Sequence, residues 1–333
     1  MIKVGLIGNG SIAQAHRAAY KHVIADGVEL CIAACCDIRP ERLEGLGDER
    51  TYTDIDTMLR EEAGKLDYVD ICLPTYLHSE AAVKALNAGF NVLSEKPMAL
   101  NTAQALAMID AANKSGKQFM VAHCCRFMGI VKYIKQIMES GELGRVRSAE
   151  FYREGGSRNP MGYQNWFRNK ELSGGAMLDL HIHDVDIINY LFGMPKAVSA
   201  VGQVVIEGSG YDAMSVNYMY DNNMFVNALC DWTIKGDKFN TRTIRVNFEN
   251  GYIFADRTAG RDCAVKVDGE GNMTDVSDIA TLDMYYHEIC YYIDCLKNDR
   301  PVDVCPPEQS AQAVEIVMAE MKSADANGER VAL

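Results

Sequence analysis

The stretch of residues 174–186 holds the densest group of side chains that could do chemistry. It reads GGAMLDLHIHDVD and contains three aspartates and two of the seven histidines. On a helix, residues four apart share a face, so we expect Asp179 and His183 to stack while His181 points elsewhere. A carboxylate beneath an imidazole orients the ring and favours its protonated form, which prepares a histidine to take a proton near pH 7. The stretch therefore predicts the start of a catalytic helix.

The same stretch also has a purely structural explanation. Aspartates favour a helix N-terminus through the helix dipole, and the histidines could pair locally. The apolar residues 187–192 follow and would bury one face of the helix. We expect no metal here, because His181 and His183 diverge on a helix and cannot converge on one ion.

Length and composition set the wider limits. A chain of 333 residues is long enough for two domains, and 48% hydrophobic residues supply an ample core. The net charge of -13 argues against nucleic acid and against an anionic membrane surface as partners. No apolar run reaches the roughly 18 residues of a membrane span, and polar residues interrupt the N-terminus early, so a cytoplasmic protein is expected. Eleven cysteines without a Cys-x-x-Cys pair predict buried thiols in a reducing compartment.

A glycine-rich turn follows the first apolar strand, residues 2–7. It has the G-x-G-x-x-A form and leads into a helical pattern that extends to Ala25. The first glycine allows a tight turn, the second lets the backbone approach a pyrophosphate, and the helix N-terminus favours the anion. The residues expected to contact a dinucleotide here are Gly8, Asn9, Gly10, Ser11 and Ile12.

The second strand, residues 29–36, ends in Asp37. An acidic residue at this place is expected to bind the adenosine ribose hydroxyls, and it would repel a 2'-phosphate. NAD is therefore favoured over NADP, although the nearby Arg39 could tolerate the phosphate. A solvated strand end or a helix cap is the alternative explanation of Asp37.

Strands and helices continue to alternate up to residue 122. Strands are predicted at 67–73, 90–93 and 118–122, with helices at 79–88 and 102–115. This spacing predicts a parallel, doubly wound sheet, which binds ligands at the carboxyl ends of its strands. The residues that we expect at those ends, close to a cofactor, are Leu73, Pro74, Thr75, His78, Glu95 and Lys96.

Taken in order, these motifs resemble the glucose-fructose oxidoreductase and inositol dehydrogenase (Gfo/Idh/MocA) family. The resemblance rests on the glycine turn 8–13, Leu77-His78, Glu95-Lys96-Pro97 and the stretch 174–186, and it covers essentially the whole chain. The Glu-Lys-Pro sequence after the fourth predicted strand is the most diagnostic part. The resemblance implies an α/β Rossmann domain followed by an α+β domain with a large, mainly antiparallel open sheet.

The resemblance also implies roles for single residues. Lys96 would reach between the nicotinamide ribose and the substrate hydroxyl, and a cis bond often precedes Pro97. Beside a nicotinium ring the pKa of the Lys96 ammonium would fall, which would help it relay a proton; by residue type alone it would be a solvated surface lysine. Arg126 would contact substrate, or else form a salt bridge between domains. Trp166 and Arg168 would touch the cofactor, although Trp166 could equally be a core anchor.

After Gly193 the chain alternates short strands with polar turns, which predicts an antiparallel sheet. The expected strands are 197–206, 212–220, 224–232, 242–248 and 252–256, and the helices 282–297 and 307–327 close the chain. One face of this sheet should cover the catalytic helix. The other is expected to form a homodimer or homotetramer. His287 is expected to be structural.

The predicted organisation is a dinucleotide-binding domain at 1–122 and a substrate-binding and oligomerisation domain at 123–333. The predicted reaction is reversible hydride transfer between NAD and a secondary hydroxyl of a sugar, sugar derivative or cyclic polyol. His183 would remove the hydroxyl proton, Asp179 would orient the imidazole, and Lys96 would stabilise the alkoxide.

Two alternatives to this reaction remain. One is a redox glycosidase that holds NAD tightly and shows no net NADH. The other is a sugar-sensing regulator on the same fold, against which the intact catalytic set argues. The sequence does not identify the sugar, because no motif fixes the substrate contacts.

Overall fold

The computed structural model describes residues 1–155, 162–221, 223–234, 241–258, 261–280 and 283–333. The chain forms two compact units. The first unit comprises Met1–Cys124 with Asp283–Ala311, and the second comprises Cys125–Leu282 with Gln312–Leu333. The functional division at residues 122 and 123 stays a prediction.

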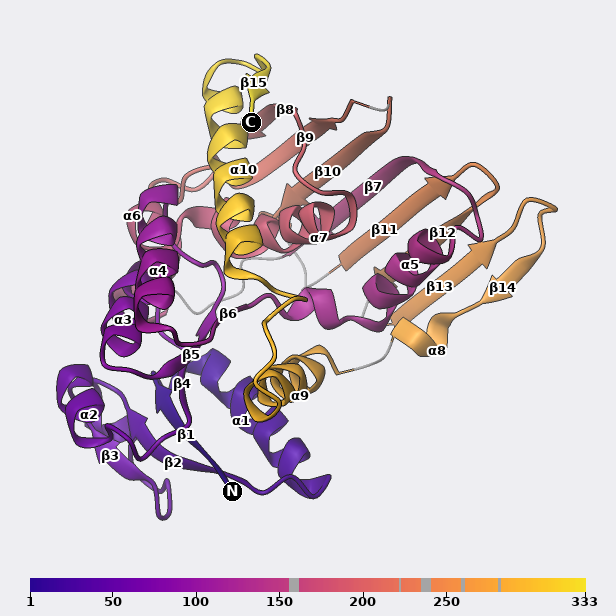
Figure 1. Ribbon diagram of the computed structural model, residues 1–333. Helices are drawn as coiled ribbons and strands as arrows, with labels where there is room; N and C mark the ends of the chain where they lie inside the picture. Colours follow the sequence, from indigo (N-terminus) through magenta and orange to yellow (C-terminus); the bar gives the residue numbers. More distant parts are fainter. Residues whose placement is uncertain (156–161, 222, 235–240, 259–260, 281–282) are drawn as a thin grey trace. The chain divides into compact units, whose positions relative to one another are not determined.

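The first unit is built on a sheet of six parallel strands in the order β3-β2-β1-β4-β5-β6 (Figure 1). The strands are β1 Ile2–Ile7, β2 Leu30–Cys36, β3 Arg50–Tyr52, β4 Tyr68–Ile71, β5 Asn91–Glu95 and β6 Phe119–Ala122. This confirms the predicted doubly wound fold. The strand order reverses between β1 and β4, and in such sheets ligands bind outside the carboxyl ends at this point.

The helices of the first unit are α1 Ser11–Ala25, α2 Ile55–Glu61, α3 Thr75–Asn87, α4 Thr102–Ser115 and α9 Met284–Lys297, with the 3-10 turn η1 Pro40–Arg42. Helix α9 comes from the C-terminal part of the chain and packs on α1. Helix α3 begins four residues earlier than predicted, directly after Pro74. A proline with φ -59° and ψ 146° is well placed to end the preceding extended segment, so Thr75 and His78 lie in the first turn of the helix.

A buried ionic network holds α1 to the sheet. The His16 ring lies 2.9 Å from an Asp70 oxygen and 3.0 Å from a Glu95 oxygen, and all three side chains are buried. Burial lowers the pKa of His16, but Asp70 and, after it, Cys72 raise it well above 6.5. Against the effect of burial, the same ring lowers the pKa of the buried Glu95 carboxyl group. The imidazole is therefore protonated and bridges the ends of β4 and β5. Tyr20 adds a hydrogen bond of 2.8 Å to Asp70.

We predict that this network makes the stability of the first unit pH-dependent. Because the pKa of His16 is raised in the folded state, its contribution is fully present below pH 6.5 and is lost as the pH rises through the folded-state value. At the acidic end of this window, His16→Gln should lower the free energy of unfolding by about 3–5 kcal/mol, since it leaves buried carboxylates without their cation.

Denaturant titration across this pH range measures the effect. His22→Gln is the matched control, because His22 is exposed on the same helix and should change stability by no more than about 0.5 kcal/mol. Equal stability of the His16→Gln and His22→Gln variants would contradict the assignment.

The second unit is built on a nine-stranded sheet in the order β14-β13-β12-β11-β7-β10-β9-β8-β15. Its strands are β7 Val146–Glu154, β8 Ala197–Gln203, β9 Ala213–Met219, β10 Phe225–Asp231, β11 Thr241–Phe248, β12 Gly251–Thr258, β13 Arg261–Val267, β14 Met273–Asp275 and β15 Val331–Ala332. The pair β7 and β10 is parallel, and the other pairs are antiparallel. The prediction of a large, mainly antiparallel sheet is confirmed.

The helices of the second unit are α5 Gly129–Ser140, α6 Lys170–Ser173, α7 Ile182–Phe192 and α8 Ser277–Ala280, with the turns η2 Cys124–Phe127, η3 Tyr163–Arg168 and η4 Met177–His181. Helix α10, Pro307–Asp325, passes from the first unit into the second. Helices α5 and α7 lie against one face of the sheet (Figure 1). Alternate residues of β9 and β10 are buried, and those between them remain partly or fully exposed on the opposite face.

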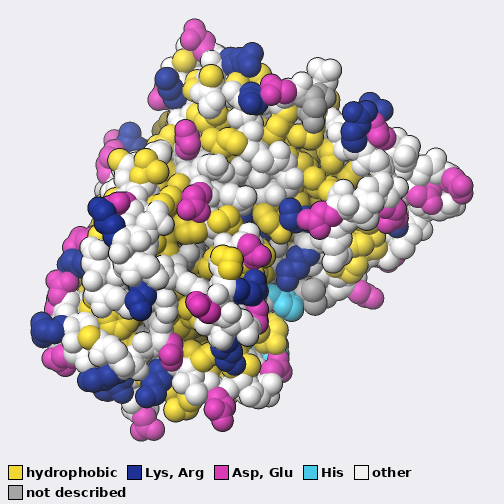
Figure 2. All heavy atoms as spheres, viewed as in Figure 1, with side chains coloured by type: hydrophobic (Ala, Val, Ile, Leu, Met, Phe, Trp, Pro, Cys, Tyr) yellow, Lys and Arg dark blue, Asp and Glu magenta, His cyan; other side chains and the backbone are white. Residues whose placement is uncertain are grey.

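The surface carries both signs of charge. Figure 2 shows acidic and basic side chains interspersed over the visible face rather than gathered into one basic patch. None of the eleven cysteines forms a disulfide, and most are buried. Within the described residues, no helix is long and apolar enough to cross a membrane.

Candidate functional site

The glycine turn after β1 has the geometry that the fingerprint predicts. Gly8 has φ +92°, and a Cβ there would lie 2.6 Å from the carbonyl oxygen of Cys72, so a side chain does not fit. A Cβ on Gly10 would meet no atom within 4 Å, which leaves the backbone open to a ligand. Helix α1 starts at Ser11 with no side-chain cap and no acidic residue in its first turn, so its N-H groups can receive an anion. Ile12 packs into the core beneath the turn.

Asp37 connects the end of β2 to this turn. Its carboxylate accepts hydrogen bonds from the backbone N-H groups of Asn9 and Arg39, both at 2.9 Å, and pairs with the Arg39 guanidinium at 3.2 Å. Burial alone would raise the pKa of Asp37, but the hydrogen bonds from Arg39 and Asn9 lower it below its usual range. Asp37 is therefore a buried anion beside the glycine turn, not a solvated strand end.

Asn9 is itself held by residues that the sequence analysis did not identify. Its side chain donates to the carbonyl of Arg42 at 2.6 Å and accepts from Arg17 Nε at 2.9 Å. Arg17 forms a two-point ion pair with Glu49 at 2.6 and 2.7 Å. No local pattern singles out Glu49, because its partner is 32 residues away.

The backbone around Lys96 is fixed on both sides. Glu95, besides its ion pair in the buried network, accepts the Lys96 backbone N-H at 3.0 Å. The buried His78 ring places one nitrogen 2.8 Å from the Pro97 carbonyl and the other 2.8 Å from the Leu73 carbonyl. Burial lowers the pKa of His78. The Lys96-Pro97 bond is cis, as the resemblance implies. Lys96 thus follows β5 at the carboxyl edge of the sheet.

In the second unit, two buried ion pairs anchor the N-terminal half of α7. Arg153 binds Asp184 at 2.8 and 2.7 Å, and Arg126 binds Asp186 at 2.8 and 2.7 Å. The Arg126 side chain is fully buried. Arg126 was expected either to contact substrate or to form a salt bridge between domains. It forms a salt bridge, but its partner Asp186 lies in the same unit. Its contact with substrate stays a prediction.

The two histidines of the stretch diverge, as predicted. His181 is buried, with Nε2 3.2 Å from Glu320 on α10 and 3.3 Å from the Tyr218 hydroxyl. Burial lowers the pKa of His181, and the Glu320 carboxylate outweighs this and raises it. His183 and Asp179, in contrast, are both partly exposed. Among the described acidic and imidazole side chains of residues 177–186, only these two reach solvent.

The backbone that carries them differs from the predicted plain helix. Residues Met177–His181 form a π-helical turn, and α7 begins at Ile182. A π turn bonds i to i+5, so the i to i+4 spacing of an α-helix does not describe the step from Asp179 to His183. The expected stacking of these two side chains therefore stays a prediction. Single π turns occur often at functional sites.

A loop of the second unit supports the start of this turn. Gly175 has φ +67°, and a Cβ there would lie 2.2 Å from the Ser209 carbonyl oxygen. That loop is organised by the buried Asp212 carboxylate, which the sequence analysis missed. The carboxylate accepts hydrogen bonds of 2.5 to 2.7 Å from the Val205 and Ile206 N-H groups, the Ser209 hydroxyl and the Trp232 indole.

The turn η3 carries Trp166 and Arg168, which were predicted to touch the cofactor. Trp166 is half-buried and packs edge-on against Phe167, with ring centroids 5.4 Å apart. Phe167 in turn packs near Trp232 at 5.8 Å. Trp166 is thus neither a buried core anchor nor fully exposed. The cofactor contact of both residues stays a prediction.

A doubly wound sheet with a glycine turn at its order reversal, joined to a wide mixed sheet, defines a dinucleotide-binding fold of two units. Residues 2–123 match the oxidoreductase family with an NAD-binding Rossmann fold, and residues 131–254 match the GFO/IDH/MocA C-terminal domain. The chain belongs to this Gfo/Idh/MocA oxidoreductase family.

Three known proteins show the range of similarity. D-glucoside 3-dehydrogenase of Escherichia coli K12 is 32% identical over 60% of this chain and 57% of its own length. The 2,7-anhydro-N-acetylneuraminate hydratase of Mediterraneibacter gnavus is 32% identical over 51% of this chain and 46% of its own length. The chain therefore spans about half the length of the curated relatives that it matches. The structure of levoglucosan dehydrogenase with NADH matches with a TM-score of 0.89 at 21% identity over 99% of this chain and 98% of that chain, which shows the fold.

We predict that Gly175→Ala destabilises the second unit more than Gly208→Ala. Both glycines have positive φ, +67° and +80°, so both substitutions carry a similar backbone strain. Only the Cβ at Gly175 meets a backbone atom, and relief of that overlap should cost roughly a further 1–3 kcal/mol. Thermal or denaturant unfolding measures the difference. Equal losses of unfolding free energy in the two variants would show that the loop carrying Ser209 moves aside and does not support the turn at Gly175.

Proposed function

We propose that this protein transfers a hydride between a nicotinamide cofactor and a secondary hydroxyl of a sugar, sugar derivative or cyclic polyol. The observation that carries the proposal is the selective exposure within residues 177–186. Buried ion pairs occupy the other charged side chains of α7 and its π turn, and Asp179 and His183 alone reach solvent. Groups kept accessible among neighbours that are locked in place are typical of a reacting site.

Each residue has a distinct role in this proposal. His183 accepts the hydroxyl proton of the substrate, and Asp179 orients the imidazole. Lys96, held at the carboxyl edge of the first sheet by Glu95 and His78, stabilises the developing alkoxide with its ammonium group. When bound, the nicotinamide accepts or donates the hydride. Arg126 is proposed to contact substrate, and its ion pair with Asp186 fixes α7.

NAD is proposed as the preferred cofactor. The Asp37 carboxylate is ionised beside the glycine turn, where a second negative charge would be repelled. Arg39, the residue that could offset this repulsion, already forms an ion pair with Asp37. Further residues proposed to contact NAD are those of the glycine turn, those that follow β4, and Trp166 and Arg168.

A second candidate is chemistry in which the nicotinamide is oxidised and reduced again within one turnover, as in a redox glycosidase. The similarity to a hydratase, at the same 32% identity as to a dehydrogenase, favours keeping this candidate. It would yield product without net NADH. A sensing regulator is disfavoured because a binding module has no need for Lys96, Asp179 and His183.

We expect His183→Ala to lower turnover by about 10² to 10⁴ while NAD affinity changes little, since general-base catalysis supplies this range. Absorbance of reduced nicotinamide is followed with NAD and pooled inositols, aldoses, sugar acids and nucleotide sugars, and with NADP in parallel. Lys96→Ala should also abolish the signal. His22→Ala and Lys117→Ala, both exposed positions of the first unit, are the matched controls.

Equal losses of turnover and NAD affinity in His183→Ala would count against its role. If no pool gives reduced-nicotinamide absorbance although NAD binding is shown separately, the second candidate would be favoured. Release of sugar from a glycoside without NADH would then establish it.

We further propose a homodimer or homotetramer formed through the open face of the second sheet, in a protein of the reducing cytoplasm. The solvent-facing residues of β8 and β10 include Val201 and Phe225, which are 58% and 55% exposed. Apolar side chains of this size on a sheet face are typical of a subunit interface, and a second copy offers the same surface.

Leu229→Glu on the open face of β10 should shift the protein toward monomers, because it buries a charge at the interface. Sedimentation velocity measures the distribution of species. Leu106→Glu is the matched control, since Leu106 is 56% exposed in the first unit. A monomeric wild-type protein, or an unchanged distribution in Leu229→Glu, would overturn this interface.

A further inference from the structure

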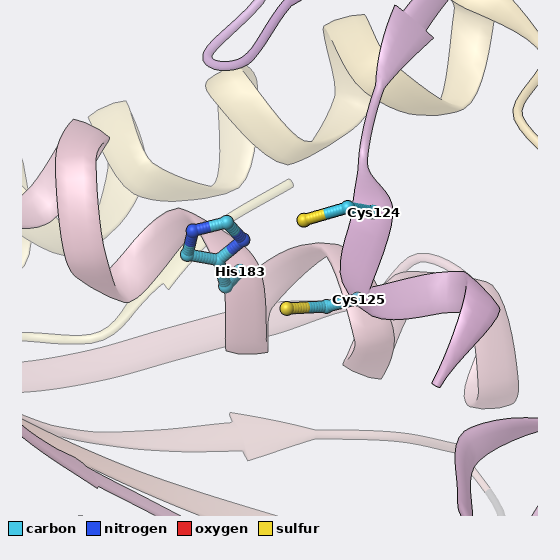
Figure 3. Close-up of side chains that lie close together, drawn as sticks. All are labelled: Cys124, Cys125 and His183. Atoms are coloured by element: carbon cyan, nitrogen blue, oxygen red, sulfur yellow. The ribbon is translucent and has the colours of Figure 1, made fainter. Parts of the chain in front are cut away.

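Two thiols and the proposed base lie together in the structure. Cys124 and Cys125 are consecutive residues of the turn η2, and His183 lies in the first turn of α7 (Figure 3). The sulfur atoms of Cys124 and Cys125 and one ring nitrogen of His183 lie within 4.8 Å of one another. Cys125 and His183 belong to the same unit, and Cys124 directly precedes Cys125 in the chain.

The donor atoms face one another and are enclosed. Figure 3 shows the imidazole with one nitrogen turned toward the two sulfur atoms. Both cysteines are 2% exposed, and neither forms a disulfide. Within the described residues, the buried Nδ1 of His183 has no hydrogen-bond partner. A buried nitrogen without a partner is costly, so an occupant that bonds to it would be favoured.

The chemistry and the size of the cluster fit a thiophilic cation. Two thiolates and one imidazole are a donor set that Zn²⁺ uses in proteins with one further position left open. Ligand atoms about 2.3 Å from a tetrahedral zinc lie about 3.8 Å apart, so this cluster must contract by roughly 1 Å at its widest.

Two buried arginines on neighbouring strands lie near Cys125. The guanidinium groups of Arg153 on β7 and Arg242 on β11 both interact electrostatically with Cys125. Arg153 forms an ion pair with Asp184. The guanidinium of the buried Arg242 lies 3.7 Å from the Asp262 carboxylate, which also pairs with Arg257.

We propose that Cys124, Cys125 and His183 form a binding site for a thiophilic divalent cation of the zinc class, and that the bound cation switches the enzyme off. On binding, each thiol releases its proton to solvent and each sulfur donates a lone pair to the cation, so no oxidant or reductant is needed. The sequence predicts no metal here, because His181 and His183 diverge on the helix and no Cys-x-x-Cys pair is present; the nearness of Cys124 and Cys125 to His183 arises only in the folded chain.

The loss of activity follows from the chemistry of the imidazole, and this half of the inference rests on the proposed role of His183. An imidazole that binds a cation through one nitrogen keeps its proton on the other. It then has no lone pair with which to accept a proton from the substrate. Metal binding and general-base catalysis at His183 therefore exclude each other.

Cobalt(II) binding to the full-length, reduced and chelator-treated protein tests the site without reference to activity. We expect one Co²⁺ per chain with a sulfur-to-cobalt charge-transfer absorbance that Zn²⁺ abolishes. Cys124→Ser and Cys125→Ser should each weaken binding by at least about tenfold, because they remove a ligand. Cys263→Ser, at an exposed cysteine elsewhere in the second unit, should bind like the wild type.

X-ray absorption of the Zn²⁺-loaded wild type needs no substitution and covers the case in which a serine variant misfolds. It should show two sulfur neighbours at about 2.3 Å and a nitrogen at about 2.0 Å. The absence of a charge-transfer band, or a zinc shell without sulfur, would overturn the proposal and would leave the thiols as packing partners of the imidazole.

An activity measurement then separates this inference from the proposed function. Zn²⁺ should inhibit NADH formation by the wild type, and each cysteine variant should be less sensitive when compared with its own metal-free rate. Binding without any dehydrogenase activity would retain the site and remove the switch. Activity that zinc leaves unchanged at full occupancy would retain the function and overturn the switch.

Discussion

The paired arginine and aspartate side chains beneath α7 are the constraint on which the candidate site depends. Arg153 with Asp184 and Arg126 with Asp186 are buried, and buried charges are tolerated only when their partners are close and well aligned. Any shift of the helix would leave a charge without a partner. His183 precedes Asp184 in the chain, so its position is set by its neighbours rather than by its own contacts.

The first unit uses the same principle with different residues. The protonated His16 bridges two buried carboxylates, and one of them, Glu95, also holds the backbone N-H of Lys96. Charges hidden from water thus determine the backbone on which the accessible lysine is carried. In both units the group proposed to react is therefore held indirectly, by buried charged side chains.

Family membership explains the architecture but leaves the chemistry to single side chains. Relatives named as a dehydrogenase and as a hydratase are both 32% identical to this chain over the parts that they match, and a solved structure shares the fold at 21% identity. Near His183 this chain carries a pair of consecutive thiols, whose sulfur atoms lie within 4.8 Å of one another and of a ring nitrogen. Such features belong to the site and not to the fold.

The sequence by itself determined the doubly wound sheet, the glycine turn and the mainly antiparallel second sheet, because strand periodicity and a glycine fingerprint are local signals. It also indicated that His181 and His183 would diverge. Only the tertiary structure decided that Arg126 pairs with Asp186, that Asp212 organises the loop against Gly175, and that two cysteines meet His183. These partners lie far apart in the chain, and charge or thiol chemistry alone names no partner. The π turn was equally hidden, since it depends on packing and not on helix propensity.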